Sequence, residues 1–117
     1  MNVTEPLKKY WQFKRVYNAK KSKADSFLVV YTLANGTDKN RLGITVSKKI
    51  GNSVTRNRIK RLVRENYRMY EKELTFGMDL VVVARKPASE ASFHDLSGSL
   101  KKIFNNLGVW QKKQLYR

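Results

Sequence analysis

The 117-residue sequence contains no cysteine and a single histidine, His94. Without cysteine the chain has no disulfide framework and no thiolate zinc site. One histidine also argues against histidine-based catalysis and a histidine metal centre. The acidic residues show no paired-carboxylate motif, and the glycines form no phosphate-binding fingerprint. We therefore expect no catalytic residue and no metal ligand in the chain itself.

Long apolar runs and acidic residues are also scarce. No run of 18 apolar residues exists, so nothing is expected to span a membrane, and the N-terminus lacks the apolar core of a signal peptide. A cytoplasmic location is therefore expected. The 9 acidic residues face 25 Lys and Arg, which gives a net charge of +16. This charge predicts a polyanionic partner, and nucleic acid is favoured over an anionic membrane surface.

The length fits one RNA-binding domain over residues 1–117, with residues 1–7 and 109–117 expected as mobile tails. Hydrophobic periodicity predicts the order helix, strand, strand, helix, strand, helix. The first two strands would be antiparallel if a hairpin joins them. The strand–helix–strand segment 41–84 implies one parallel pairing within a mixed sheet. The expected helices are 8–18, 54–74 and 92–107, the expected strands are 26–33, 41–47 and 80–84, and residues 19–25 are expected to be a connector.

Cap signals mark the ends of two helices. Ser53 and Thr55 compete as the N-cap of the second helix. Ser92, followed by Asp95 three residues later, is an acidic variant of the capping box at the third. Gly108 is well placed to end that last helix.

The second helix carries most of the functional signal. From Arg56 to Arg68, six of thirteen residues are basic and one is acidic. Ile59, Leu62 and Val63 fall on one arc of the helix, opposite the basic arc. A solvated surface helix is the alternative interpretation, but such faces usually mix charges of both signs, and none is acidic between Arg56 and Arg64. The pattern favours a helix that packs on one side and binds phosphates on the other.

Three aromatic residues form a second candidate site: Phe13, Tyr17 and Tyr31. Core packing explains them as well as a functional role does. As a functional group they would stack unpaired bases, with Lys14 and Arg15 nearby to attract phosphates. Both interpretations remain open from the residues alone.

The segment Leu42 to Asn52, followed by Arg56 to Glu65, closely resembles the protein component of bacterial ribonuclease P. Arg56-Asn57-Arg58 is the signature of that family. Phe13 and the Val16-Tyr17 pair match its first helix, and residues 82–88 match its last strand and the loop after it. The resemblance covers about residues 7 to 107. Position 10, an Asn helix cap in many relatives, is Tyr here.

The resemblance implies a fold and a function. The family fold is an α/β (α+β) two-layer sandwich, a mixed sheet with helices like a ribosomal-protein domain, with a left-handed crossover where general rules predict a right-handed one. The family binds a large catalytic RNA, and the complex removes the 5′ leader of precursor tRNA by endonucleolytic hydrolysis. The RNA holds the Mg²⁺ ions, so the protein is the noncatalytic subunit of an endoribonuclease.

Carried over by position, the resemblance assigns two groups of site residues and names as partners the catalytic RNA and precursor tRNA, with no membrane or protein partner. The three aromatic residues of the second candidate site would hold the leader: Phe13, Tyr17 and Tyr31. The catalytic RNA would contact Lys48, Lys49, Asn52, Arg56, Asn57, Arg58, Lys60, Arg61 and Arg64. The main alternative is a structural RNA-binding protein of ribosomal type without a role in cleavage. A membrane-surface protein and a protein-catalysed nuclease are less favoured.

Overall fold

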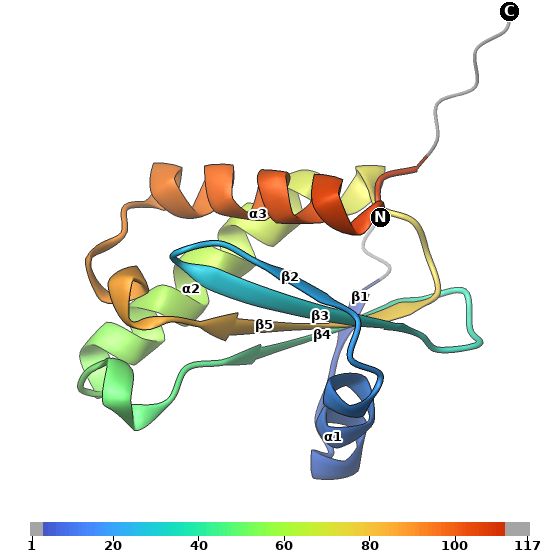
Figure 1. Cartoon of the computed structure of the whole chain (residues 1–117), viewed down its shortest axis with the longest axis horizontal. Coiled ribbons are helices and arrows are strands. Elements are labelled where there is room, and N and C mark those ends of the chain that lie inside the picture. Colours follow the sequence, from blue (N-terminus) through green and yellow to red (C-terminus); the bar gives the residue numbers. More distant parts are fainter. Residues whose placement is uncertain (1–3, 112–117) are drawn as a thin grey trace, which may run out of the picture.

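The computed structural model describes residues 4–111, which form one mixed five-stranded sheet in the order β1-β4-β5-β3-β2. Two helices, α2 and α3, cover one face of the sheet, and the short α1 lies on the other (Figure 1). The α/β sandwich predicted from the sequence is therefore confirmed. The strands are β1 (Thr4–Pro6), β2 (Ser22–Ala24), β3 (Leu28–Ala34), β4 (Asn40–Thr45) and β5 (Met78–Ala84), and the helices are α1 (Tyr10–Asn18), α2 (Ser53–Tyr70) and α3 (Phe93–Leu107).

Strand β5 occupies the centre of the sheet. It pairs parallel with β4 and antiparallel with β3. The expected parallel pairing is confirmed. The first two long strands, β3 and β4, do not form the hairpin that would have made them an antiparallel pair, because β5 lies between them. An almost wholly apolar strand is most stable where both of its faces are covered, and that place is the middle of the sheet.

Alternation along β5 divides the apolar residues into two cores. Leu80 and Val82 belong to the large core under α2 and α3, while Val81 joins a small core under α1. The apolar arc of α2 fills the large core, and Ile59 and Val63 are fully buried there. The smaller core therefore holds α1 against the sheet with only a few side chains.

The observed caps explain where α2 begins. Asn52 Oδ1 accepts a hydrogen bond from Thr55 N at 2.9 Å, so Asn52 is the N-cap and the expectation of Ser53 or Thr55 is wrong. An Asn side chain caps as well as Ser does, and Asn52 has the extended backbone that a cap requires. The helix ends at Tyr70, and a 3₁₀ turn from Glu71 to Glu73 follows it. This turn explains why the sequence predicted a helix as far as residue 74.

The predicted ends of α3 are confirmed. Asp95 N donates to Ser92 Oγ at 3.0 Å, and Ser92 N donates to Asp95 Oδ2 at 2.9 Å. The backbone N–H of Ser92, and to a lesser extent its side chain, hold the pKa of the Asp95 carboxyl below its usual range. Gly108 ends the helix with a left-handed φ of 71°, which glycine adopts without a steric penalty.

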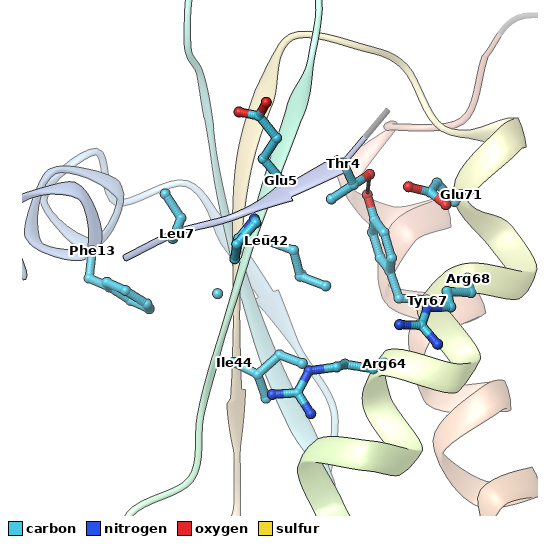
Figure 2. A pocket seen from close by; sticks show the side chains of 12 residues that line it. Thr4, Glu5, Leu7, Phe13, Leu42, Ile44, Arg64, Tyr67, Arg68 and Glu71 are labelled. Carbon is cyan, nitrogen blue, oxygen red and sulfur yellow. Dashed lines mark hydrogen bonds between the residues drawn. The ribbon is translucent and has the colours of Figure 1, made fainter. Parts of the chain in front are cut away.

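Segments expected to be tails or connectors are part of the fold. Thr4–Pro6 pairs with β4, and Thr4 Oγ1 hydrogen-bonds to Tyr67 Oη at 2.7 Å (Figure 2). Trp110 packs edge-on against Phe104, with ring centroids 5.8 Å apart. Residues 4–7 and 109–110, expected within the tails, therefore take part in the fold, while residues 1–3 and 112–117 lie outside the described residues. Part of the expected connector, Ser22–Ala24, is strand β2.

None of the helices within residues 4–111 combines the length and the apolar character needed to cross a bilayer.

Candidate nucleic-acid interface

On the sheet face that α1 partly covers, the register of the strands aligns the side chains in rows. Gly43, Val81 and Tyr31 are aligned across β4, β5 and β3. The next row toward the end of β4 is Thr45, Val83 and Val29, called the open row below. All three residues of the open row are only half-buried. This row is the part of the sheet face where a ligand can approach.

Helix α1 lies along one side of the open row. The ring of Phe13 lies against Gly43, where an added Cβ would come within 2.7 Å of Phe13 Cζ. Tyr17 meets Tyr31 edge to face with ring centroids 4.9 Å apart, and Tyr17 Oη lies 3.3 Å from Thr45 Oγ1. The two tyrosines thus come together beside the open row, while Phe13 is placed further back, against the sheet.

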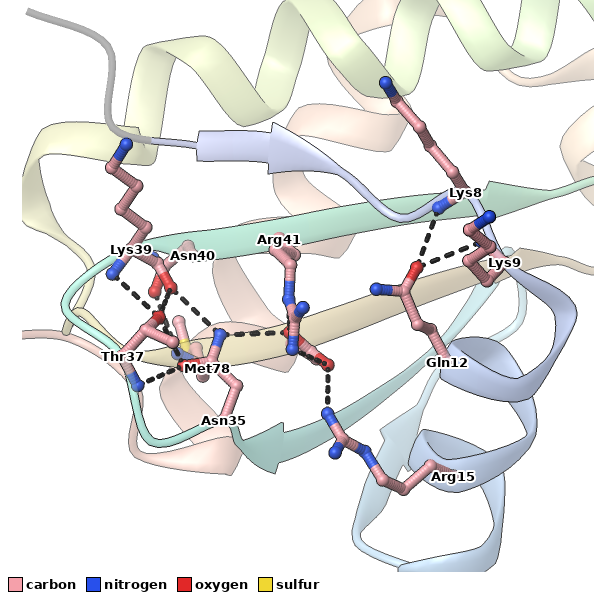
Figure 3. A network of polar contacts seen from close by, with 11 residues as sticks. Lys8, Lys9, Gln12, Arg15, Asn35, Thr37, Lys39, Asn40, Arg41 and Met78 are labelled. Atoms are coloured by element: carbon pink, nitrogen blue, oxygen red, sulfur yellow. Dashed lines mark hydrogen bonds and ion pairs between the residues drawn. The ribbon is translucent and has the colours of Figure 1, made fainter.

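A charged network fixes α1 to the sheet (Figure 3). Asp79 of β5 is fully buried. Its carboxylate accepts hydrogen bonds from Arg41 Nε at 2.7 Å, from an Arg15 guanidinium nitrogen at 3.2 Å and from Asn35 Nδ2 at 3.0 Å. Arg15 belongs to α1 and also stacks over the Trp11 ring. The orientation of the aromatic helix therefore depends on one buried carboxylate.

The helix start that faces this network is set by Gln12. Its Oε1 accepts hydrogen bonds from the backbone N of Lys8 and of Lys9, both at 3.0 Å (Figure 3). This is half of a capping box. It places the first helical residue at Tyr10, two residues after the predicted start.

The basic loop and the start of α2 lie at the same end of the sheet as the open row. β4 ends at Thr45, in the open row, and the chain then enters the 3₁₀ turn Lys48–Ile50 and α2. The side chains of Lys48 and Lys49 are exposed. Lys86, after β5, donates from Nζ to the backbone O of Lys49 at 3.2 Å. Cations from two loops therefore border the open row, beside which the two tyrosines meet.

The two arginines of the Arg-Asn-Arg signature are partly engaged in holding the fold. Arg56 Nε donates to the backbone O of Gly51 at 3.1 Å, and Arg58 donates to the backbone O of Ala91 at 2.6 Å. Each of these bonds uses one of the five N–H donors of a guanidinium, so both side chains retain donors for phosphate. The fixed geometry also reduces the rotamer entropy lost on binding. Asn57 between them is exposed.

The rest of the predicted catalytic-RNA surface follows α2. Arg61 and Arg64 are exposed, and Lys60 is half-exposed. Arg61 lies 3.8 Å from Glu65 in an exposed i,i+4 pair, which holds it weakly. Asn52 is exposed, but its Oδ1 is used as the helix cap, so its amide nitrogen is the group it can offer. The nine residues therefore form a connected surface from the loop along α2.

Sequence reasoning missed several residues of this region. Val29, Val83 and Thr45 join the tyrosines only through the sheet register. Trp11 is 56% exposed on α1 and stacks with Arg15, and its position beside basic residues in the sequence was a signal that could have been used. Asp79 gave no signal, because a single acidic residue next to an apolar run suggests a strand end.

Acidic side chains of the described region do not fit a metal site. No three His, Cys, Asp or Glu side chains within residues 4–111 come together as a ligand group. The one fully buried carboxylate, that of Asp79, is enclosed by two arginines, and a divalent cation there would meet like charge.

The chain is similar to known proteins of one family. The family model described as Ribonuclease P matches residues 1–108. The ribonuclease P protein components of Natranaerobius thermophilus and Caldanaerobacter subterraneus subsp. tengcongensis are 47% and 45% identical; the first alignment covers 96% of this chain and 97% of the relative, and the second covers 92% and 93%.

Solved structures are similar as well. The Staphylococcus aureus RNase P protein superposes with a TM-score of 0.84 at 38% identity, covering 91% of this chain and 97% of that one. The Thermotoga maritima RNase P protein gives 0.76 at 33% identity, covering 84% and 93%. The chain therefore belongs to the ribonuclease P family, whose members are protein subunits of a tRNA-processing ribonucleoprotein endoribonuclease.

Proposed function

We propose that this chain binds the ribonuclease P catalytic RNA through the basic loop and α2, and binds the 5′ leader of precursor tRNA on the open row. The observation that carries the proposal is the position of the open row. It lies between the Tyr17–Tyr31 pair and the cations of the Lys48 and Lys86 loops. A single strand lying there could stack a base on a tyrosine while its phosphates meet lysines.

The two surfaces would act together on the substrate. Two RNA molecules brought close repel each other through their phosphates, and a protein of net charge +16 between them reduces that repulsion. The leader is the part of the precursor that mature tRNA lacks, so contacts to it select the substrate over the product. Within residues 4–111 no three His, Cys, Asp or Glu side chains come together, and we propose that the RNA holds the Mg²⁺ ions and supplies the chemistry.

Leader binding is tested by measuring affinity for precursor and mature tRNA with the reconstituted complex. Tyr17→Leu keeps an apolar contact with the sheet and removes the stacking ring. We expect about 5- to 100-fold weaker binding of precursor tRNA, because a stacked base contributes about 1–3 kcal/mol. Binding of mature tRNA should be unchanged. The matched control is Tyr10→Leu at the start of the same helix, a residue that is 79% exposed.

An equal loss for both tRNAs would contradict the leader assignment. Cleavage at low Mg²⁺, with and without the protein added to the catalytic RNA, tests participation in the reaction. No stimulation by the protein would favour a purely structural RNA-binding role instead.

Assembly with the catalytic RNA should depend steeply on salt, because each neutralised phosphate releases counterions. Arg61→Gln should weaken assembly and reduce the slope of log affinity against log salt by about one unit. Lys102→Gln on α3 removes the same charge from an exposed site outside the proposed surface. An identical change of slope in both variants would show that net charge matters and the α2 surface does not.

A further inference from the structure

A cavity of about 350 Å³ lies between the edge of the sheet and α2, and its lining extends to Gly43 and Phe13. It is bounded by β1, the edge of β4 and the C-terminal half of α2 (Figure 2). Its size falls within the range of small-molecule sites, which is about 300–1,000 Å³. Leu7, Leu42 and Ile44 give it an apolar wall. The polar groups come from β1, which contributes Thr4 and Glu5, and from α2 and the turn that follows: Arg64, Tyr67, Arg68 and Glu71.

Helical spacing brings the polar groups of α2 and of the turn that follows to one side of the helix. Residues three, four and seven apart share a face. Arg64 and Arg68 are like charges at i,i+4, which destabilises an isolated helix, and an anion bound between them would relieve that repulsion. With a rise of about 1.5 Å per residue, Glu71 lies about 4.5 Å further along the axis than Arg68. The cavity therefore has cations toward one end and a carboxylate toward the other (Figure 2).

The carboxylate is the unusual group. Glu71 is only 7% exposed, and among the described residues its Oε2 has no hydrogen-bond partner. Tyr67 beside it is buried, and its hydroxyl forms a hydrogen bond with the hydroxyl of Thr4. Burial raises the pKa of Tyr67 above its usual 10.0, and the negative charge of the Glu71 carboxylate adds to the rise. A buried carboxylate oxygen without a donor is costly unless a ligand supplies one.

We propose that this cavity binds one unpaired RNA nucleotide, with its phosphate on Arg64 and Arg68 and an exocyclic amino group of its base donating to the Glu71 carboxylate. The base would lie against the apolar wall of Leu7, Leu42 and Ile44. Guanidinium groups bind phosphate through paired hydrogen bonds. The inference rests on the proposed RNA-binding function, because Arg64 continues the α2 surface assigned to the catalytic RNA.

The chemistry of the carboxylate selects among the bases. Adenine, cytosine and guanine carry an exocyclic amino group, and Glu accepts from the amino group of cytosine in known base readout. Uracil carries no amino group. Its one ring N–H stands between two carbonyl oxygens, which repel a carboxylate. The site should therefore disfavour uridine.

The test is a titration of the full-length ¹⁵N-labelled protein with cytidine 5′-monophosphate and with uridine 5′-monophosphate at one ionic strength. We expect the amide signals of Tyr67, Arg68 and Glu71 to shift saturably, with cytidine monophosphate binding at least about fivefold more tightly. Glu71→Gln should abolish this preference, and Arg68→Gln should weaken both nucleotides alike. The matched control is Glu73→Gln, an exposed carboxylate in the same 3₁₀ turn, which should change neither.

Stability separates this role from a structural one. If the Glu71 carboxylate has a structural role, Glu71→Gln should lower the urea midpoint of unfolding. If it serves to bind a ligand, Glu71→Gln should leave the midpoint unchanged or raise it. Equal affinity for the two nucleotides, or shifts confined to residues outside the cavity, would overturn the proposal. If that happens while the protein still stimulates leader cleavage, the cavity assignment alone fails. Absence of stimulation would instead reject the proposed function.

Discussion

Asp79 gives the sharpest prediction about stability. In Asp79→Asn a fully buried carboxylate that serves two arginines becomes neutral, and one of its acceptor oxygens becomes a donor facing a guanidinium. Removing one partner of a buried ion pair costs about 3–5 kcal/mol. The side chains of Arg15 and Arg41 are 44% and 21% exposed, so both can recover some hydration, and we expect the lower end, about 3 kcal/mol.

Urea unfolding measures this loss. With a slope of about 1.5 kcal/mol per molar, the midpoint should fall by about 2 M. Domains have about 5–15 kcal/mol of stability, so the variant should still fold in buffer. The matched control is Glu5→Gln, which removes the same charge from an exposed pair with Lys39 at 3.3 Å. Exposed pairs contribute about 0–1 kcal/mol, so this midpoint should fall by less than about 0.7 M.

The same variant tests whether the network positions α1. Loss of the Arg15 contact frees the helix from one of its attachments, so precursor tRNA should bind more weakly while mature tRNA binding is retained. Similar midpoint shifts in Asp79→Asn and Glu5→Gln would refute the reasoning, because burial would then have no role in the strength of the pair. A normal precursor affinity in a clearly destabilised Asp79→Asn protein would refute the positioning role alone.

Three further substitutions have effects whose signs the structure determines. Gly43→Val would place a side chain against the ring of Phe13, so the free energy of unfolding measured in urea should fall by about 1–3 kcal/mol. Gly98→Ala has open space around it and should raise the free energy of unfolding by about 1 kcal/mol, because alanine favours the helix. A Gly43→Val protein of unchanged stability would contradict the observed packing. Because the pKa of Tyr67 is raised on folding, its contribution to stability is complete below about pH 10 and is lost as pH rises through the raised value. Tyr67→Phe should therefore lose less stability than the parent protein between about pH 9 and pH 11, and parallel curves in urea would contradict this.

Some of the architecture could be predicted from the sequence because the signals were local. The apolar run from Leu80 to Ala84 predicted the central strand, and the Ser92 capping box predicted the start of α3. Both features depend on residues within one turn or one strand. The basic and apolar arcs of α2 were predictable for the same reason.

What could not be predicted depends on contacts between distant segments. β1 and β2 have three residues each, too few to show a period, and they exist because partner strands offer free hydrogen bonds. The ion pairs of Asp79 join it to residues 38 and 64 positions away. The cavity beside Glu71 likewise requires β1 to lie next to α2. No pattern in the sequence reports such pairings.

The two short strands at the sheet edges have a consequence for the protein before it meets RNA. A long exposed edge offers unpaired N–H and C=O groups to another chain and promotes aggregation. Here each edge strand has only three residues; β1 ends in Pro6, which has no N–H, and β2 carries Lys23. Newly made copies should therefore resist joining edge to edge, and RNA would meet a supply of monomers.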